Sequence, residues 1–524
     1  METARIVVRG SVLRAVSLVA YTLVGFFLMP FVVHSLGDRV YGYWVLVGTI
    51  LGYYGLLDLG IVSAVQFHVA KALGEKDTAA ANRAICTTFF SFAALGLVIA
   101  LLTVIVAAFS PYFIKSPADA TLFRHVILVM GFGFALGFPG RAFVGALSAH
   151  LRWDVIASIG LGILAIRTGL IVFVIKAGWG IVSLATVTVL GDIVMYSLYY
   201  LMLRRIQTDF TLLPGLASMG ALKEVLNYSS YTLIIKISEQ LRFYLDAVVV
   251  GAFLAVSAVT HYSVASRLAL SYRELMIALL GSLSPWFSSL LGRREYSQMK
   301  RVFELGTRIS VSVSTIVACC LLVYGKRFIA AWMGKSYTDA YWPLCFLVGA
   351  IFFDVSQIPS PSYLFGVSRH RFLAYMTLVE GVFNLALSLY FVRFYGLAGV
   401  ALGSFIPMAT LWFLVLPIYT CQQVGIRASR YYWELFGRTA LVNAGAILIP
   451  WFLVFKWLVG TGLVSIVAVI ACQVVIAVGA AYLCSLERTE REAVRRIVFG
   501  RPISGTGMVE PRPDEAVVSP RSGS

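Results

Sequence analysis

Long apolar segments follow one another along almost the whole 524-residue chain, and they constrain its fold more than any other feature. A helix needs about 20 apolar residues to cross the hydrocarbon core of a bilayer, and the sequence holds about 14 such segments. Hydrophobic residues make up 60% of the chain and charged residues 13%. The sequence therefore predicts an all-α polytopic membrane protein with about 14 transmembrane helices. Their approximate centres are Leu23, Leu51, Leu95, Gly133, Leu164, Leu190, Ala247, Leu270, Val317, Phe352, Leu385, Leu411, Ile449 and Val469.

The net charge of +17 is explained by membrane orientation and does not indicate nucleic-acid binding. If the N-terminus is cytoplasmic, 28 of the 42 Lys and Arg residues fall on the cytoplasmic side of the predicted spans and 9 on the opposite side. This is the positive-inside bias of membrane proteins. We expect both termini to be cytoplasmic, because an even number of spans returns the chain to the side on which it began.

The two halves of the chain resemble each other at a nearly constant offset, which predicts an internal repeat. Pro139 matches Pro359, and Arg83 at the end of EKDTAAANR matches Arg301 at the end of RREYSQMKR. The remaining matches are Tyr41 with Tyr262, Gly145 with Gly366, Arg152 with Arg371 and Gly180 with Gly396, all at offsets of 216 to 221. Because the loops recur with the same sidedness, the repeat is predicted to be parallel, an arrangement that transporters use.

The repeat and the longest polar break predict the domain organisation. A six-helix bundle is expected over residues 1–203, a cytoplasmic linker over 204–227, and a second six-helix bundle over 228–426. Two additional transmembrane helices are expected over 427–486, outside the repeat. The basic tail over 487–524 is expected to be largely disordered, with a short helix at its start.

Charged residues inside two neighbouring apolar segments mark the candidate site. The segment from Tyr231 carries Lys236, Glu239, Arg242 and Asp246. On a regular helix these four lie within an arc of about 120°. An ionised group at the bilayer centre costs roughly 2.5–3.5 kcal/mol, so this stripe is expected to face a hydrated interior. The next segment holds Arg267, Arg273 and Glu274, and Arg267, Ser271 and Glu274 form a similar polar stripe at spacings of four and three residues.

A purely structural interpretation of the first stripe stays open. Its charges alternate in sign at spacings of three and four residues, so they are also able to neutralise one another as pairs on the helix surface. The two segments together nevertheless carry four basic groups against three acidic ones.

Several stretches resemble a known family of membrane proteins. They are YGYWVLVGTILGYYGLLDLGI, LDAVVVGAFLAVSAVTHYSVASRL, and two elements in which proline, glycine and arginine recur with similar spacing from Pro139 and Pro359. With the span count of twelve plus two, the chain resembles the polysaccharide-transporter branch of the MATE-like multidrug/oligosaccharidyl-lipid/polysaccharide exporter superfamily. The resemblance covers roughly residues 5–486. It implies a V-shaped pair of six-helix bundles, with a central cavity lined by the first, second, seventh and eighth spans.

The resemblance implies a bacterial inner-membrane flippase for a polyprenyl-diphosphate-linked oligosaccharide used in surface polysaccharide synthesis, such as O-antigen or exopolysaccharide. We expect basic side chains to replace the hydration of the diphosphate, because Arg binds phosphate oxygens bidentately. The expected headgroup contacts are Arg242, Arg267, Lys236, Arg273, Arg14 and Arg167. Asp58, Glu239 and Asp246 are candidates for coupling to an ion. Three isolated intramembrane acids, Asp192, Asp354 and Glu380, have either cavity roles or buried hydrogen bonds.

Two other functions remain as alternatives. A MATE-like multidrug exporter shares the fold, but an excess of basic groups in the cavity repels cations. A membrane-embedded polysaccharide polymerase or ligase also has many spans, but the outer loops expected here are short and lack clustered carboxylates. We therefore expect a transporter and not an enzyme. The partners expected are the lipid-linked oligosaccharide, the bilayer and other polysaccharide-assembly membrane proteins.

Neither a cofactor nor a metal is expected. The six histidines lie in separate regions, and the seven cysteines lie in or beside apolar segments without the spacing of a metal site. The cysteines are most simply small hydrophobic residues.

Overall fold

A computed structural model describes residues 2–217, 237–485 and 490–491, except for the single positions 59, 115, 243, 282, 370, 459 and 461. Within these ranges all regular secondary structure is helical. The chain divides into two compact units, Met1–Ser263 and Val264–Ser524. The boundary falls inside one helix, α11 (Val256–Leu280), whose first turns belong to the first unit and whose remainder belongs to the second.

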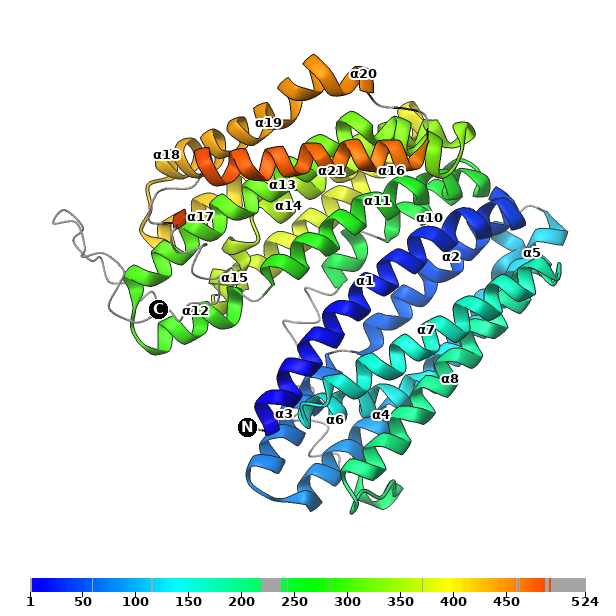
Figure 1. Cartoon of the computed structure of the whole chain (residues 1–524). Coiled ribbons are helices and arrows are strands. Elements are labelled where there is room, and N and C mark those ends of the chain that lie inside the picture. The colour runs from blue at the N-terminus through cyan, green and yellow to red at the C-terminus, as the bar shows by residue number, and fades with distance from the viewer. Residues whose placement is uncertain are drawn as a thin grey trace. The chain divides into compact units, whose positions relative to one another are not determined.

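The first unit is a bundle of long helices that run side by side (Figure 1). Helix α4 packs against α5, α1 packs against α7, and both α5 and α7 pack against α8. Phe92, Phe123 and Phe138 are fully buried between these helices. The elements are α1 (Glu2–Leu36), α2 (Asp38–Tyr54), η1 (Gly55–Asp58), α3 (Ile61–Gly74), α4 (Thr78–Phe113), α5 (Pro117–Gly137), η2 (Phe138–Gly140), α6 (Arg141–Ala149), α7 (Trp153–Lys176), α8 (Gly180–Ile206), η3 (Pro214–Leu216), α10 (Leu245–Phe253) and the start of α11.

The second unit is also a helical bundle, built around the long helix α13. Helix α13 packs against α14, α19 and α21, while α14 packs against α16 and α12 against α15. The elements are α12 (Leu283–Gly292), α13 (Tyr296–Trp332), η4 (Lys335–Ala340), α14 (Tyr341–Ser356), α15 (Pro359–Gly366), α16 (Arg371–Thr410), η5 (Leu411–Val415), α17 (Leu416–Val424), α18 (Ala428–Arg430), η6 (Tyr431–Gly437), α19 (Arg438–Pro450), η7 (Trp451–Phe455), α20 (Lys456–Leu458), α21 (Leu463–Ala480) and η8 (Ala481–Ser485).

The predicted all-α membrane fold is confirmed, whereas the predicted number of 14 spans is not. Among the described residues, 12 helical segments are long and apolar enough to cross a membrane. One of them, Arg371–Val424, has 54 residues and contains two helices that meet at a kink, where Gly396 has φ 55°. The predicted seventh span begins within residues 218–236, which lie outside the described residues. The chain is a multi-pass membrane protein.

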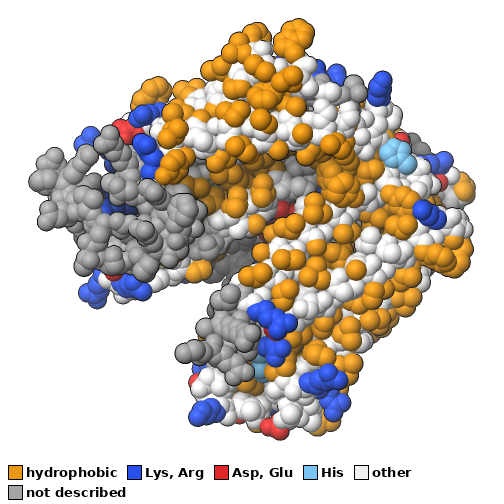
Figure 2. Space-filling view, in the orientation of Figure 1, with side chains coloured by type: hydrophobic (Ala, Val, Ile, Leu, Met, Phe, Trp, Pro, Cys, Tyr) orange, Lys and Arg blue, Asp and Glu red, His pale blue; other side chains and the backbone are white. Residues whose placement is uncertain are grey.

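The surface of the helices agrees with a lipid environment. Large apolar side chains such as Leu97, Ile166 and Leu190 are exposed near the middle of their helices. Figure 2 shows apolar side chains along the helices, with the Lys and Arg side chains in view gathered mainly near helix ends. Because apolar residues lie on the outside, the burial of a charged group inside a bundle is the informative observation.

The internal repeat is visible in the backbone as well as in the sequence. Among the described residues, four non-glycine residues have positive φ, and they form two pairs: Lys76 with Arg294, and Leu151 with Ser368. The offsets of 218 and 217 residues fall inside the range found from the sequence matches. The residue after each one closes the same hydrogen bond back to the preceding helix, as Asp77 N to Ala72 O and Glu295 N to Leu290 O illustrate. Corresponding helices therefore end in the same way in both halves.

Candidate functional site

A group of buried polar side chains lies within the first unit, where α2, residues 237–242, α10 and the start of α11 meet. We call it the polar cluster, and it consists of Tyr53, Gln240, Asp246 and Tyr262. Arg242 is buried as well, two residues after Gln240 on the same helical segment. Arg242 is 3% exposed and Asp246 is 4% exposed. These two residues belong to the predicted charged stripe, and the structure buries both.

The backbone positions these side chains differently from the single regular helix assumed for the stripe. Residues 237–242 are helical, Tyr244 lies in a turn, and α10 begins at Leu245. Because the helix is interrupted between Arg242 and Asp246, these two residues do not share one face of a continuous helix, whereas the predicted stripe assumes that they do. The break places Asp246 in the first turn of α10, where a helix favours negative charge.

Asp246 is held by a tyrosine on the neighbouring helix. The Tyr262 hydroxyl of α11 donates a hydrogen bond of 2.5 Å to Oδ2 of Asp246. On the α2 side, the Tyr53 hydroxyl lies close enough to Asp246 for an electrostatic interaction. The carboxylate thus lies near two phenol groups, one of which is bonded to it.

Two hydrogen-bond donors of the cluster are buried without a hydrogen-bond acceptor among the described residues. They are the Tyr53 hydroxyl and the Nε2 amide of Gln240. The Gln240 amide approaches α2 at Gly52 so closely that a Cβ built there would lie 2.7 Å from Nε2. A glycine at position 52 is what allows this approach. Buried donors normally find acceptors, so this site is suited to water or to a ligand that supplies acceptor oxygens.

The chemistry of the cluster is that of an oxygen-rich ligand site. Gln240 and Tyr53 bring neutral donors, and Arg242, nearby on the chain, offers five potential donors and a permanent charge. Phosphate and sugar hydroxyl oxygens are acceptors that match this set. Asp246, already bonded to Tyr262, is the acidic group within the cluster.

The other acids predicted for the site differ in their surroundings. Asp58 is buried, and its Oδ1 accepts a hydrogen bond of 3.3 Å from the Val62 backbone N–H at the start of α3. Glu239 and Glu274 are exposed. Lys236 lies outside the described residues. Of the acids predicted to couple to an ion, Asp246 is therefore the one inside the polar cluster.

In the second unit, α11 carries the two predicted arginines in different environments. Arg273 donates from Nε to Oδ2 of Asp354 on α14 at 2.8 Å, and the Asp354 side chain is 8% exposed. Arg267 is partly buried. The sequence predicts separate roles for Arg273 and Asp354, but in the structure they form an ion pair.

A second isolated acid, Glu380, is also bonded. The Trp412 indole N–H of η5 donates to Oε2 of Glu380 at 2.7 Å, and Glu380 is fully buried. The hydrogen-bonded alternative considered for this residue is the one that the structure contains.

The remaining predicted arginines lie elsewhere in the first unit. Arg167 of α7 forms an ion pair with Asp192 of α8, and the two side chains are 23% and 41% exposed. Arg14 is exposed on α1, and its guanidinium lies 4.7 Å from the centre of the Trp153 ring. Neither arginine belongs to the polar cluster, and the charge of Arg167 is balanced by Asp192.

Sequence reasoning missed three members of the cluster: Tyr53, Gln240 and Tyr262. The sequence identifies Tyr262 as the repeat partner of Tyr41, but an uncharged residue in an apolar segment gives no direct sign of a binding site. The sequence signal that could have identified these three residues is their position on predicted spans that carry charged residues or adjoin a span that does. Among the described residues, no group of three or more His, Cys, Asp or Glu side chains is placed to hold a metal ion.

Comparison with known proteins adds information about ancestry. Residues 56–341 match the sequence profile of a family described as "Polysaccharide biosynthesis protein". A segment of 187 residues is 21% identical to the probable low-salt glycan biosynthesis flippase Agl15 of Haloferax volcanii. This segment covers 36% of the chain and 40% of that relative, so the match spans less than half of the relative's length.

Solved structures establish the fold. The lipid II flippase MurJ, in an inward closed conformation, has a TM-score of 0.67 at 14% identity, covering 94% of this chain and 99% of that one. An inward-facing multidrug resistance MATE transporter has a TM-score of 0.63 at 14% identity, covering 77% and 94% of the two chains. A transporter of the same superfamily from Pyrococcus furiosus, described as having reversed binding-pocket polarity, has a TM-score of 0.57, 14% identity and coverage of 81% and 96%. These neighbours are described as flippases or transporters.

Proposed function

Because the chain belongs to the polysaccharide biosynthesis protein family, we propose that it is a flippase for a lipid-linked oligosaccharide. The substrate is a polyprenyl-diphosphate-linked oligosaccharide, which the protein moves from the cytoplasmic to the outer leaflet by alternating access. The family profile, the partial match to a glycan flippase and the likeness in fold to a lipid II flippase all support this proposal. We propose the cytoplasmic membrane of a bacterium as its location, with both termini cytoplasmic.

The observation that carries the proposal is the polar cluster. Two buried donors lack acceptors among the described residues, and Arg242 is buried two residues along the chain from one of them, Gln240. A diphosphate and its sugars offer many acceptor oxygens and negative charge, and they cannot cross hydrocarbon without replacement of their hydration. Arg242, Gln240 and Tyr53 supply that replacement in this proposal.

The other predicted basic residues are ranked by their surroundings. Arg267 is the second candidate for contact with the anionic headgroup. Arg273 and Arg167 each lie against an acid, so they are weaker candidates, and Arg14 is stacked on an indole ring.

We propose further that Asp246 couples transport to a cation, because it is the acid inside the polar cluster and Arg242 is buried four residues before it. A change in its charge alters the field around the headgroup site directly. In a test with an imposed pH or sodium gradient, Asp246→Asn is expected to remove the gradient dependence of flipping, whereas Glu239→Gln retains it. A gradient response that is the same in both variants would assign the coupling to another residue.

The multidrug exporter is the second candidate, because structures of MATE transporters share the fold. The donor-rich cluster argues against it, since an organic cation needs acceptors and negative charge. Transport of a cationic dye that is lost in Asp246→Asn and retained in Arg242→Gln would favour this second function.

The deciding experiment is translocation of a fluorescent polyprenyl-diphosphate oligosaccharide in proteoliposomes. Arg242→Gln is expected to slow flipping by about 10- to 100-fold, which corresponds to one or two charge-assisted hydrogen bonds. Arg83→Gln is the matched control, because Arg83 is half exposed and forms only a 3.8 Å surface pair with Asp77. Undiminished flipping by Arg242→Gln would remove the proposed site but keep the function, and absence of flipping by folded wild-type protein would remove the function.

A further inference from the structure

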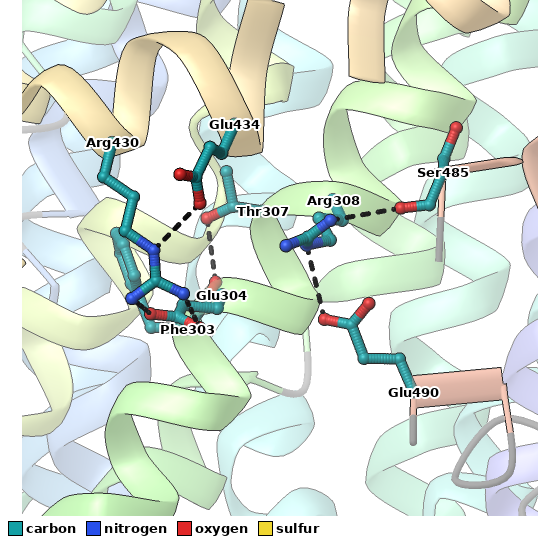
Figure 3. A network of polar contacts seen from close by, with 8 residues as sticks. All are labelled: Phe303, Glu304, Thr307, Arg308, Arg430, Glu434, Ser485 and Glu490. Atoms are coloured by element: carbon teal, nitrogen blue, oxygen red, sulfur yellow. Dashed lines mark hydrogen bonds and ion pairs between the residues drawn. The ribbon is translucent and has the colours of Figure 1, made fainter. Parts of the chain in front are cut away.

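The inner face of α13 carries two charged residues of opposite sign, one helical turn apart, and each contacts a different segment of the second unit. These residues are Glu304 and Arg308. Figure 3 shows Glu304 directed toward Arg430 and Arg308 directed toward Ser485 and Glu490. The segment at Arg430 leads into α19, and the segment at Ser485 and Glu490 follows α21.

The contact with the C-terminal segment is buried. Arg308 lies 3.4 Å from Oε1 of Glu490 through its Nε, and the two side chains are 7% and 15% exposed. The same guanidinium donates from Nη1 to the Ser485 carbonyl at 3.3 Å. Next to it, the Asn443 amide of α19 donates to the hydroxyls of Ser312 and Ser485, both at 3.1 Å.

The contact with the preceding segment has the opposite polarity. Arg430 lies 3.3 Å from Oε1 of Glu304, whose side chain is 15% exposed. Arg430 also bonds Glu434 at 3.1 Å, but the Glu434 side chain is 52% exposed. The chain is therefore tied to α13 both before it enters the last pair of apolar helices and after it leaves them.

Apolar and polar contacts join the same three helices along their length. Ile316 and Cys320 of α13 pack with Ile447 of α19 and Ile466 of α21. The Gln473 side chain of α21 bonds the Tyr324 hydroxyl and the Ile447 carbonyl. The ion pairs of Arg308 with Glu490 and of Glu304 with Arg430 thus add to the packing of α13, α19 and α21 against one another.

We propose that Glu304 and Arg308 form a docking surface on α13 for this chain's own C-terminal segment and for the segment before α19. Charge complementarity identifies the occupants: Glu490 sits on the basic residue and Arg430 on the acidic one. The docked segments tie α13, α19 and α21 together, with Glu490 held on α13. This inference does not depend on the substrate, so it stands or falls separately from the proposed transport function.

The test is limited trypsin digestion of the purified full-length protein, with cleavage after Arg491 followed by mass spectrometry. Arg491 adjoins Glu490, so its cleavage reports release of the docked segment. A charged contact of this kind changes the released fraction by about tenfold or more, and the cleavage rate follows that fraction when opening is fast. We expect Glu490→Gln to be cleaved about tenfold faster than wild type.

The double-variant comparison separates docking from general loosening. Arg308→Gln is expected to match Glu490→Gln, and the two changes together are expected to add little beyond either one. Glu434→Gln removes an exposed carboxylate from the same network and is expected to leave the cleavage rate unchanged. A wild-type rate for Glu490→Gln, full multiplication of the two effects, or equal acceleration by Glu434→Gln would overturn the proposal. If Arg308→Gln does not fold, Glu490→Gln against Glu434→Gln still decides between the outcomes.

Discussion

Two tyrosines flank Asp246, and they should respond differently to removal of the hydroxyl group. Tyr262 is 1% exposed and donates a 2.5 Å hydrogen bond to the carboxylate. The Tyr53 hydroxyl is buried nearby, but it has no hydrogen-bond partner among the described residues. Substitution by phenylalanine keeps the ring and its packing in both cases, so the pair isolates the value of one hydrogen bond.

The magnitude follows from the kind of bond. A hydrogen bond to a charged group contributes about 1.5–3 kcal/mol, and in Tyr262→Phe the buried carboxylate loses this donor. For a unit of about this size, the loss corresponds to a fall in Tm of roughly 3–12 °C. Tyr53→Phe removes a hydroxyl that makes no such bond, so its Tm is expected to stay within about 2 °C of wild type.

The assay is thermal unfolding of the purified protein in detergent, followed by intrinsic or thiol-reactive fluorescence. Flipping in proteoliposomes is measured on the same preparations. Tyr53→Phe is expected to lower flipping while leaving Tm nearly unchanged, because its hydroxyl is assigned to the substrate. Equal losses of Tm in the two variants would refute the view that Tyr262, and not Tyr53, stabilises the carboxylate by a hydrogen bond. Normal flipping by Tyr53→Phe would remove Tyr53 from the ligand site.

Two further predictions concern the backbone. Gly42→Ala is expected to destabilise the first unit by about 1–3 kcal/mol in thermal unfolding, because a Cβ there would lie 2.1 Å from the Val256 carbonyl oxygen. Gly48→Ala on the same helix is the control. A Cβ at position 48 has no atom within 4 Å, so this variant should be neutral or slightly stabilising. Lys76→Gly and Arg294→Gly are each expected to stabilise the protein by about 0.5–1 kcal/mol, since both residues have φ near 60° and glycine adopts this conformation without the Cβ clash. Destabilisation in either glycine variant would show that the side chain at that turn makes a contact worth more than the relieved strain.

Sequence reasoning was most successful where a property is local or periodic. Apolar segments predict membrane-spanning helices because the hydrophobic effect acts on composition alone. The repeat is evident from sequence matches such as Pro139 with Pro359, each of which lies at the junction of two α-helices of its half. The burial of Arg242 and Asp246 also follows from charge in an apolar segment.

The features that were missed depend on contacts between distant residues. Arg273 forms an ion pair with Asp354, which lies 81 residues later in the chain. Arg308 forms an ion pair with Glu490, which follows the last two apolar helices in the sequence. Helix α13 begins at Tyr296 and carries Arg308 into the bundle, where it meets Glu490. The turn at Tyr244 was also unexpected, because no proline or glycine adjoins it, and tertiary packing decides such a break.

The turns at Lys76, Arg294, Leu151 and Ser368 suggest how a duplicated membrane protein keeps its shape while its side chains diverge. A lysine stands where its counterpart is an arginine, and a leucine where its counterpart is a serine, yet the backbone takes the same left-handed step each time. The hydrogen bonds that close these turns come from main-chain atoms, so mutation of the side chain does not remove them. The turns between corresponding helices therefore keep the same backbone geometry in both halves. Each half can then alter its interior for a different task while its helices still enter and leave the membrane in the inherited directions.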